Sequence, residues 1–211
     1  GFDAEQAVAG LAHFGEYRIQ QNYFKMHACC WYNHPVLDAV EDLLAREKFQ
    51  ASEVGTIKVE APPMAATMAN PHPANMLSAK FSIPYAIAAA IVHGTTGVDA
   101  FCPRMLEHPQ IPSLAEKVDV QSDVKMDIRR YDYPTAKVTV TLSDGRDISQ
   151  EVVAHRGDSR NPVDPEELQG KFLSLAREAL GEEGAAQVIE MACDLENLDN
   201  IRQFMRLLVK V

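Results

Sequence analysis

Cysteines, long apolar runs and basic residues are all scarce in this sequence. Its four cysteines lack the repeated spacing of a disulfide framework, so we expect a reducing, cytoplasmic setting. No run approaches the roughly 20 apolar residues that cross a bilayer. No secretory signal is visible in the first residues. The sequence therefore predicts no contact with a membrane.

Acidic residues outnumber basic ones by 30 to 20, which gives a formal net charge of -10. Nucleic-acid surfaces need clustered Lys and Arg, so a nucleic-acid partner is excluded. An anionic small molecule is not excluded, because a local cationic pocket can lie within an acidic protein. The chain has 211 residues, 46% of them hydrophobic, which is ample for an independent core.

The most apolar stretch is SAKFSIPYAIAAAIVHG, residues 78–94, which predicts a buried helix. A helix that is apolar nearly all round is covered on most sides. Ser82 is expected to cap this helix, with Pro84 in its first turn. Tyr85 then lies at the positive end of the helix, where an anion is favoured. The alternative is a core tyrosine whose hydroxyl is already satisfied.

Strand character appears in four stretches: residues 54–61, 118–128, 137–143 and 147–154. In the first of them, alternate side chains are expected on one side of the sheet: Gly55, Ile57, Val59 and Ala61. Asp144-Gly145 predicts a hairpin turn between the last two stretches, because both residues tolerate positive φ.

Helices are expected on both sides of the strands. One opens at residues 33–35, where a proline follows Asn and His. Another opens at residues 164–167 with a cap, a proline and acidic residues, and ends at Gly181. Amphipathic helices follow at residues 185–193 and 198–209. This order predicts an α+β unit, with the buried helix packed on its sheet, flanked by helical pieces.

His34 is the first candidate for chemistry. At a helix start its imidazole could contact a carboxylate or move a proton; the alternative is a solvent-exposed cap histidine. Lys25 and Lys80 are cations close in sequence to the two candidates His34 and Tyr85, and a polycarboxylate needs cations around it. The alternative for both lysines is simple solvation.

A metal site is the rival interpretation of the same region. Four side chains are of metal-binding types: His27, Cys29, Cys30 and His34. Zinc sites usually space their cysteines by two or more residues, and adjacent cysteines do not easily bind one ion. An iron–sulfur cluster needs well-spaced cysteines that are missing here. The sequence therefore predicts no metal.

Three stretches, in the same order, resemble hallmark segments of the MmgE/PrpD family. They are FKMHACCWYNHPVLDAV at residues 24–40, AKFSIPYAIAAAIVHG at residues 79–94 and HRGDSRNPVDPEELQGKF at residues 155–172. Members of this family include 2-methylcitrate dehydratases, cis-aconitate decarboxylases and iminodisuccinate epimerases. The chain resembles the C-terminal half of a family member.

The resemblance implies a two-domain protein with a large helical domain and a smaller α+β lid whose sheet is antiparallel. Residues 50–158 would form the lid, while residues 1–49 and 159–211 would belong to the helical domain. The pocket would lie between the domains, partly in the N-terminal half. Family members are commonly dimers, so we expect a homodimer or association with the missing half.

The resemblance also implies a cofactor-free carbon-oxygen lyase, most simply a dehydratase, that acts on a di- or tricarboxylate. Dehydration, decarboxylation and epimerisation all remain open. His34 and Tyr85 match catalytic positions, Lys25 matches a family lysine, and Lys80 is its companion in substrate binding. Gly157 and residues 161–162 match a structural return loop.

The match departs from the family at Met26, His27 and Ala28, where members often carry proline and an aromatic residue. Four other histidines match no catalytic motif and are interpreted as surface or packing residues: His72, His93, His108 and His155. Two rival functions stay open. One is a non-catalytic binding or interaction module that keeps the lid, and the other is a thiol or metal protein built on Cys29 and Cys30.

Overall fold

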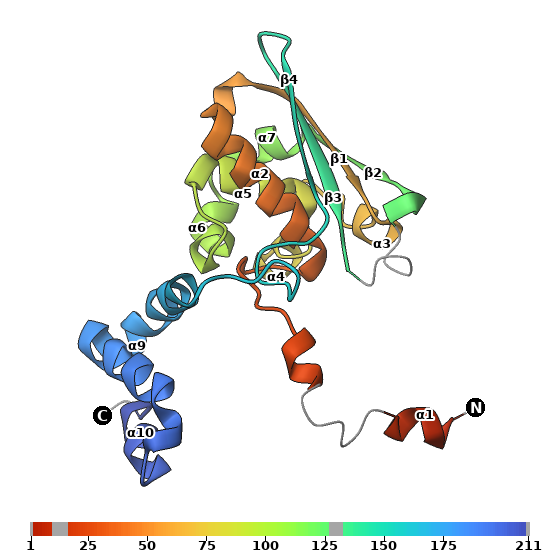
Figure 1. Cartoon of the computed structure of the whole chain (residues 1–211). Coiled ribbons are helices and arrows are strands. Elements are labelled where there is room, and N and C mark those ends of the chain that lie inside the picture. The colour runs from red at the N-terminus through yellow and green to blue at the C-terminus, as the bar shows by residue number, and fades with distance from the viewer. Residues whose placement is uncertain (1, 10–16, 127–132, 210–211) are drawn as a thin grey trace. The chain divides into compact units, whose positions relative to one another are not determined.

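The computed structural model describes residues 2–9, 17–126 and 133–209 of the chain. The chain divides into two compact units, Gly1–Pro162 and Val163–Val211. Figure 1 shows helix α2 lying along one face of the sheet in the first unit.

The first unit combines a four-stranded sheet with short and long helices. In chain order its elements are α1 (Ala4–Val8), η1 (Arg18–Gln21), η2 (Trp31–Asn33), α2 (His34–Glu47), η3 (Ala51–Glu53), β1 (Val54–Ala61), α3 (Pro63–Ala66), α4 (Met76–Ala79), α5 (Ile83–His93), η4 (Val98–Phe101), α6 (Pro103–Leu106), α7 (Gln110–Ala115), β2 (Val118–Ser122), η5 (Val124–Met126), β3 (Ala136–Leu142) and β4 (Asp147–Val152). The second unit contains α9 (Pro165–Cys193), η6 (Leu195–Asn197) and α10 (Ile201–Leu207).

The sheet has the strand order β2-β1-β3-β4. The predicted α+β class is confirmed, and so is the β3–β4 hairpin, whose turn places Gly145 at a φ of 89°. The sheet is mixed rather than antiparallel, because β2 runs parallel to β1. The helices α3 to α7 lie between these two strands in sequence and give the chain room to return in the same direction. Of the strand predicted at residues 118–128, the last two residues lie outside the described part of the chain.

Strand β1 contains an irregularity that alternation alone does not predict. Ile57, Val59 and Ala61 are buried as expected, but Gly55 is not. The pairing of β1 with β3 shifts between Val54 and Thr56, so that Val54 takes the inward place. The prediction that Gly55 lies on the same side of the sheet as Ile57, Val59 and Ala61 was therefore wrong.

Helix α5 has the caps that the sequence predicts. The Ser82 hydroxyl oxygen accepts a hydrogen bond from the Tyr85 backbone N–H at 3.0 Å, and Gly94 ends the helix at a φ of 74°. Every side chain from Ile83 to Ala90 is buried. The all-round apolar pattern thus marks a helix that is covered on most sides.

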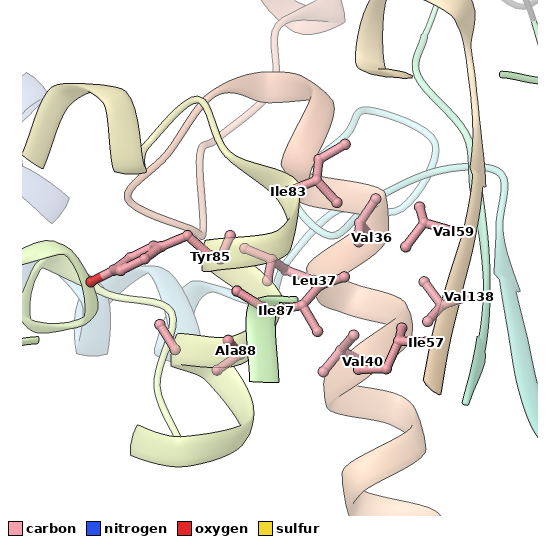
Figure 2. Close-up of a cluster of buried hydrophobic side chains, with 14 of the residues drawn as sticks. Val36, Leu37, Val40, Ile57, Val59, Ile83, Tyr85, Ile87, Ala88 and Val138 are labelled. Atoms are coloured by element: carbon pink, nitrogen blue, oxygen red, sulfur yellow. The ribbon is translucent and has the colours of Figure 1, made fainter. Parts of the chain in front are cut away.

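Helix α2 covers strands β3 and β4 of the sheet. Figure 2 shows Val36 and Val40 of α2 facing the strands, while Leu37 faces Ile87 of α5. Helix α2 packs against β3 and β4 on one side and against α5 on the other, and α5 also packs against the edge strand β2. The predicted packing of α5 on the sheet is found at the edge strand β2.

The second unit begins at the predicted cap. The Asp164 carboxylate accepts a hydrogen bond from the Glu167 backbone N–H at 2.7 Å. Gly181 has a φ of 73° and a ψ of 170°, which breaks α9 into two helical segments where a helix end is predicted. Neither α9 nor any other described helix is long and apolar enough to cross a membrane. The domain boundaries at residues 49/50 and 158/159 stay a prediction for the whole family protein.

Gly157 forms the tight loop that follows β4. Its φ is 86°, its N–H donates to the Asn161 carbonyl oxygen at 2.9 Å, and its carbonyl oxygen accepts from the Phe24 N–H at 2.9 Å. A Cβ atom at residue 157 would overlap the Phe24 carbonyl oxygen. The loop therefore holds the segment that carries Lys25 by direct backbone contact.

Alanine substitutions at Gly145 and Gly157 distinguish the cost of the positive φ from the cost of the close contact with Phe24. Gly145 has a similar φ of 89°, but nothing lies near its missing side chain. We expect Gly145→Ala to lower the free energy of unfolding by about 1–2 kcal/mol. Gly157→Ala should lower it by at least about 1 kcal/mol more, because the backbone overlap must also be relieved. Urea denaturation measures both, and equal losses would contradict the close approach.

Candidate active site

The starts of α2 and α5 are tied together through one carbonyl group. The Lys80 carbonyl oxygen accepts hydrogen bonds from the Cys30 N–H at 2.9 Å and from the Asn33 side-chain amide at 3.0 Å. Asn33 precedes α2, and Lys80 lies just before α5. Two stretches that lie far apart in the sequence are thereby joined beside His34.

His34 opens α2 and is completely buried. Neither of its ring nitrogens has a hydrogen-bond partner of good geometry, and only the Cys29 backbone interacts with the ring as a hydrogen-bonding group among the described residues. Among the described residues, only Asn33 and Thr135 share this property of a buried side-chain polar atom without a partner. Buried polar groups are normally paired, so an unpaired imidazole is unusual. The hydrogen-bonding capacity of the His34 ring is therefore largely unused.

The pKa of His34 is lowered to about 2, chiefly because burial disfavours the charged ring. The nearby imidazoles of His27 and His155 and the Lys25 ammonium lower it further, while the Cys29 backbone opposes them in part. His34 is therefore neutral at physiological pH. A neutral imidazole offers one lone pair and one N–H to a substrate.

Two further imidazoles flank His34, with ring centroids 5.0 Å away for His27 and 5.1 Å away for His155. His155 accepts a hydrogen bond at Nε2 from the Trp31 indole N–H at 2.8 Å, and its Nδ1 lies 2.9 Å from the Arg156 carbonyl oxygen. Indole can only donate and a carbonyl can only accept, so His155 carries its one proton on Nδ1. Each ring nitrogen of His155 thus makes one hydrogen bond.

His27 is held just as firmly. Its Nε2 lies 2.8 Å from an Asp38 carboxylate oxygen and its Nδ1 lies 2.5 Å from the Thr96 hydroxyl oxygen. The second Asp38 oxygen accepts from the Arg156 backbone N–H at 2.6 Å. Sequence reasoning missed this network because Thr96 and Arg156 are distant in the chain. A signal was present, since His27 and Asp38 are both polar within otherwise apolar surroundings.

The two predicted lysines lie around Cys29. Lys25 is exposed and Lys80 is partly buried. Burial raises the pKa of the Cys29 thiol to about 12, while the charges of Lys25 and Lys80 act in the opposite direction. The positive charge of Lys25 also lowers the pKa of His34. The structure thus brings Lys25, Lys80 and His34 into one neighbourhood, and it keeps the Cys29 thiol protonated, which argues against a thiolate nucleophile.

Tyr85 lies elsewhere in the core. Its hydroxyl donates to the Ala100 carbonyl oxygen at 2.9 Å, and its ring packs on Phe101. Burial raises its pKa to about 12. In Figure 2 the Tyr85 hydroxyl points away from α2, and among the described residues no contact joins it to His34. A catalytic role for Tyr85 stays a prediction.

Three side chains could together approach a metal ion. His27, Asp38 and Glu41 place one candidate ligand atom each within 4.8 Å of one another. His27 Nε2 and the Asp38 oxygen are 2.8 Å apart, which is a hydrogen bond. The geometry is that of a hydrogen-bonded network, and it differs from the set of cysteines and histidines considered from the sequence.

Comparison with known proteins identifies a family whose model matches this chain. The family model of the MmgE/PrpD C-terminal domain matches residues 27–197. A cis-aconitate decarboxylase of Aspergillus terreus is 24% identical over 223 residues, which cover 98% of this chain and 44% of that protein. Human cis-aconitate decarboxylase is 25% identical over 130 residues, which cover 62% of this chain and 27% of that protein. The chain spans less than half the length of these relatives.

Burial of His34 predicts a specific dependence of stability on pH. Its folded pKa lies below the unfolded value of about 6.5, so the unfolded state binds the proton more readily. This contribution to stability is complete above that pH and is lost as the pH falls toward the folded value. Between about pH 7.5 and about pH 5.0, the wild type should lose about 2 kcal/mol more than His34→Gln.

Urea denaturation at both pH values gives this difference. His72→Gln serves as the control, because it removes an imidazole whose side chain is 56% exposed. If His34→Gln loses stability with falling pH as steeply as the wild type, His34 is not buried in its neutral form.

Proposed function

The chain belongs to the MmgE/PrpD family, and on that premise we propose that it forms the C-terminal part of a lyase that acts on a di- or tricarboxylate. The observation that carries the proposal is His34, a neutral and fully buried imidazole with no hydrogen-bond partner of good geometry at either nitrogen. Strongly perturbed titratable groups of this kind gather at active sites.

The proposed chemistry begins with electrostatics. Lys25 supplies a positive charge near His34, Lys80 supplies another near Cys29, and His34 itself lies at the positive end of the α2 dipole. Together they favour a substrate with several carboxylates. The same charges would stabilise the anion that forms when a proton or a carboxyl group leaves the neighbouring carbon.

His34 would then move the proton. In the enclosed site its low pKa makes it a weak base. A carboxylate beside the ring favours the imidazolium, so substrate binding would itself raise the basicity of His34. Because the ring is completely covered, a covering segment must move before substrate can reach it. Tyr85 would join only by exchanging the Ala100 carbonyl oxygen for a substrate oxygen.

The reaction type is the finer part of the proposal. The sequence favours a dehydratase, whereas the curated relatives named above are decarboxylases. Both reactions form an anion next to a carboxylate, and neither calls for a redox cofactor. We propose that the remainder of the pocket comes from the other half of a family protein, in the same chain or in a partner chain.

The test is carried out on this chain combined with the half that completes it. Candidate polycarboxylates, with cis-aconitate and 2-methylcitrate among them, are incubated in heavy water, and NMR follows loss of the proton next to a carboxylate. His34→Ala and Tyr85→Phe should each slow exchange by about a hundredfold if the residue is a general acid or base. His72→Ala is the control on an exposed imidazole.

The outcomes separate the roles. Wild-type exchange in His34→Ala would remove His34 from the mechanism, and the same result in Tyr85→Phe would remove Tyr85. Binding of a polycarboxylate without exchange or loss of carbon dioxide would favour a non-catalytic binding module.

Self-association is a further part of the proposal. Ile201 and Met205 of α10 are four residues apart and about half exposed, which leaves an apolar face on the second unit. Light scattering at micromolar concentration should give a mass near twice 23.3 kDa. The double variant Ile201→Glu/Met205→Glu should be monomeric. A monomeric wild type would contradict self-association of this chain.

A further inference from the structure

His27, Asp38, Thr96 and Glu41 form one continuous chain of hydrogen bonds beside His34. Asp38 and Glu41 lie three residues apart on α2, and His27 and Thr96 bridge them. The Thr96 hydroxyl oxygen lies 3.0 Å from a Glu41 carboxylate oxygen and 2.5 Å from His27 Nδ1. His27 and Asp38 are nearly inaccessible to solvent, whereas Glu41 is partly exposed.

The number of protons shared among these four hydrogen-bonded side chains follows from which of their atoms can donate and which can accept. An ionised carboxylate only accepts hydrogen bonds, and a hydroxyl has a single proton to donate. With both carboxylates ionised, Thr96 gives its proton to Glu41 and must receive one from His27 Nδ1. Asp38 receives another from His27 Nε2. If Nδ1 carried no proton, Thr96 could satisfy only one of its two short contacts.

We infer that His27 is doubly protonated, an imidazolium fixed between Asp38 and the Thr96–Glu41 pair, and that it is the positioning residue of His34. Its ring stands at 68° to the His34 ring, with centroids 5.0 Å apart. Both of its N–H groups are directed to other partners. His27 therefore gives His34 a positive charge without giving it a hydrogen bond.

Two consequences follow for His34. A cation beside the ring disfavours a second cation, and among the neighbouring side chains His27 has the largest part in lowering the His34 pKa. The same cation attracts a substrate carboxylate into the space next to His34. This second role rests on the proposed function, whereas the protonation state of His27 does not.

The hydrogen-bond partners of His27 and His155 indicate that His27, and not His155, carries the positive charge. Asp38 also accepts from the Arg156 backbone N–H at 2.6 Å, so its second oxygen is already used as an acceptor. Of the two imidazoles that flank His34, His155 is fixed as a neutral ring by Trp31 and the Arg156 carbonyl oxygen. A positive charge in this cluster of imidazoles is thus assigned to His27.

The first experiment locates the protons. Nitrogen-15 NMR of the full chain near neutral pH should show one histidine with both ring nitrogens protonated, and this signal should be absent from His27→Gln. Thr96→Ser keeps the hydroxyl and should retain the signal. Thr96→Val keeps the shape but removes the acceptor, and His27 should then lose its Nδ1 proton. A neutral His27 in the wild type, with a proton on Nε2 alone, would overturn the inference.

The second experiment asks what the charge does in the completed enzyme. Glutamine at residue 27 can keep one donor and one acceptor but has no charge, so a purely structural role would survive His27→Gln. We expect His27→Gln and Thr96→Val to lower kcat by about 10- to 100-fold, and Thr96→Ser to restore most of the loss. Activity of wild-type level in both uncharged variants would overturn the catalytic role.

These results remain separable from those of the proposed function. If the completed protein neither binds nor converts any polycarboxylate, the proposed function fails, and nitrogen-15 NMR still decides whether His27 is doubly protonated. If wild-type protein is active and His27 is neutral, the function stands and this inference is rejected.

Discussion

Burial of the first half of α2 from both sides is the constraint on which the site depends. The sheet covers one side of this helix and α5 covers the other, so its polar residues are enclosed together with its apolar ones. Burial of a polar group is unfavourable unless hydrogen bonds replace those to water. Asp38 meets this condition through His27 and the Arg156 backbone, while His34 does not. The packing of one helix thereby creates both a rigid ionic network and an unsatisfied imidazole.

The sequence alone predicts the local features well, because they depend on neighbouring residues. Ser82, Gly94 and the Asp144-Gly145 turn all act over a few positions, and each is found where it is expected. The direction of β2 and the irregularity at Gly55 depend on strands far apart in sequence, and local alternation carries no information about them. His34 is found from its place at a helix start, and its burial depends on α5. His27 has partners 11 and 69 residues away, so no spacing rule reveals it.

Charge is distributed unevenly with respect to the site. The chain carries a formal net charge of -10, yet Lys25, Lys80 and His27 gather within reach of His34 or Cys29. An acidic exterior repels small anions in general, whereas a local group of cations attracts those that carry several carboxylates. A preference for anions with several charges would therefore arise from the contrast between the whole protein and this local group of cations. It would weaken as salt screens the exposed Lys25 more than the buried His27.

The mixed sheet has a consequence for the order of folding. The β3–β4 hairpin closes over a short turn, but the parallel β1–β2 pair must wait until the helices between them are collapsed, because closing a long loop is entropically unfavourable. The Arg156 contact with Asp38 spans an even longer stretch, of 118 residues. The chemical site therefore forms among the last parts of the molecule. A partly folded chain would have its hairpin and its helices but not the arranged imidazoles.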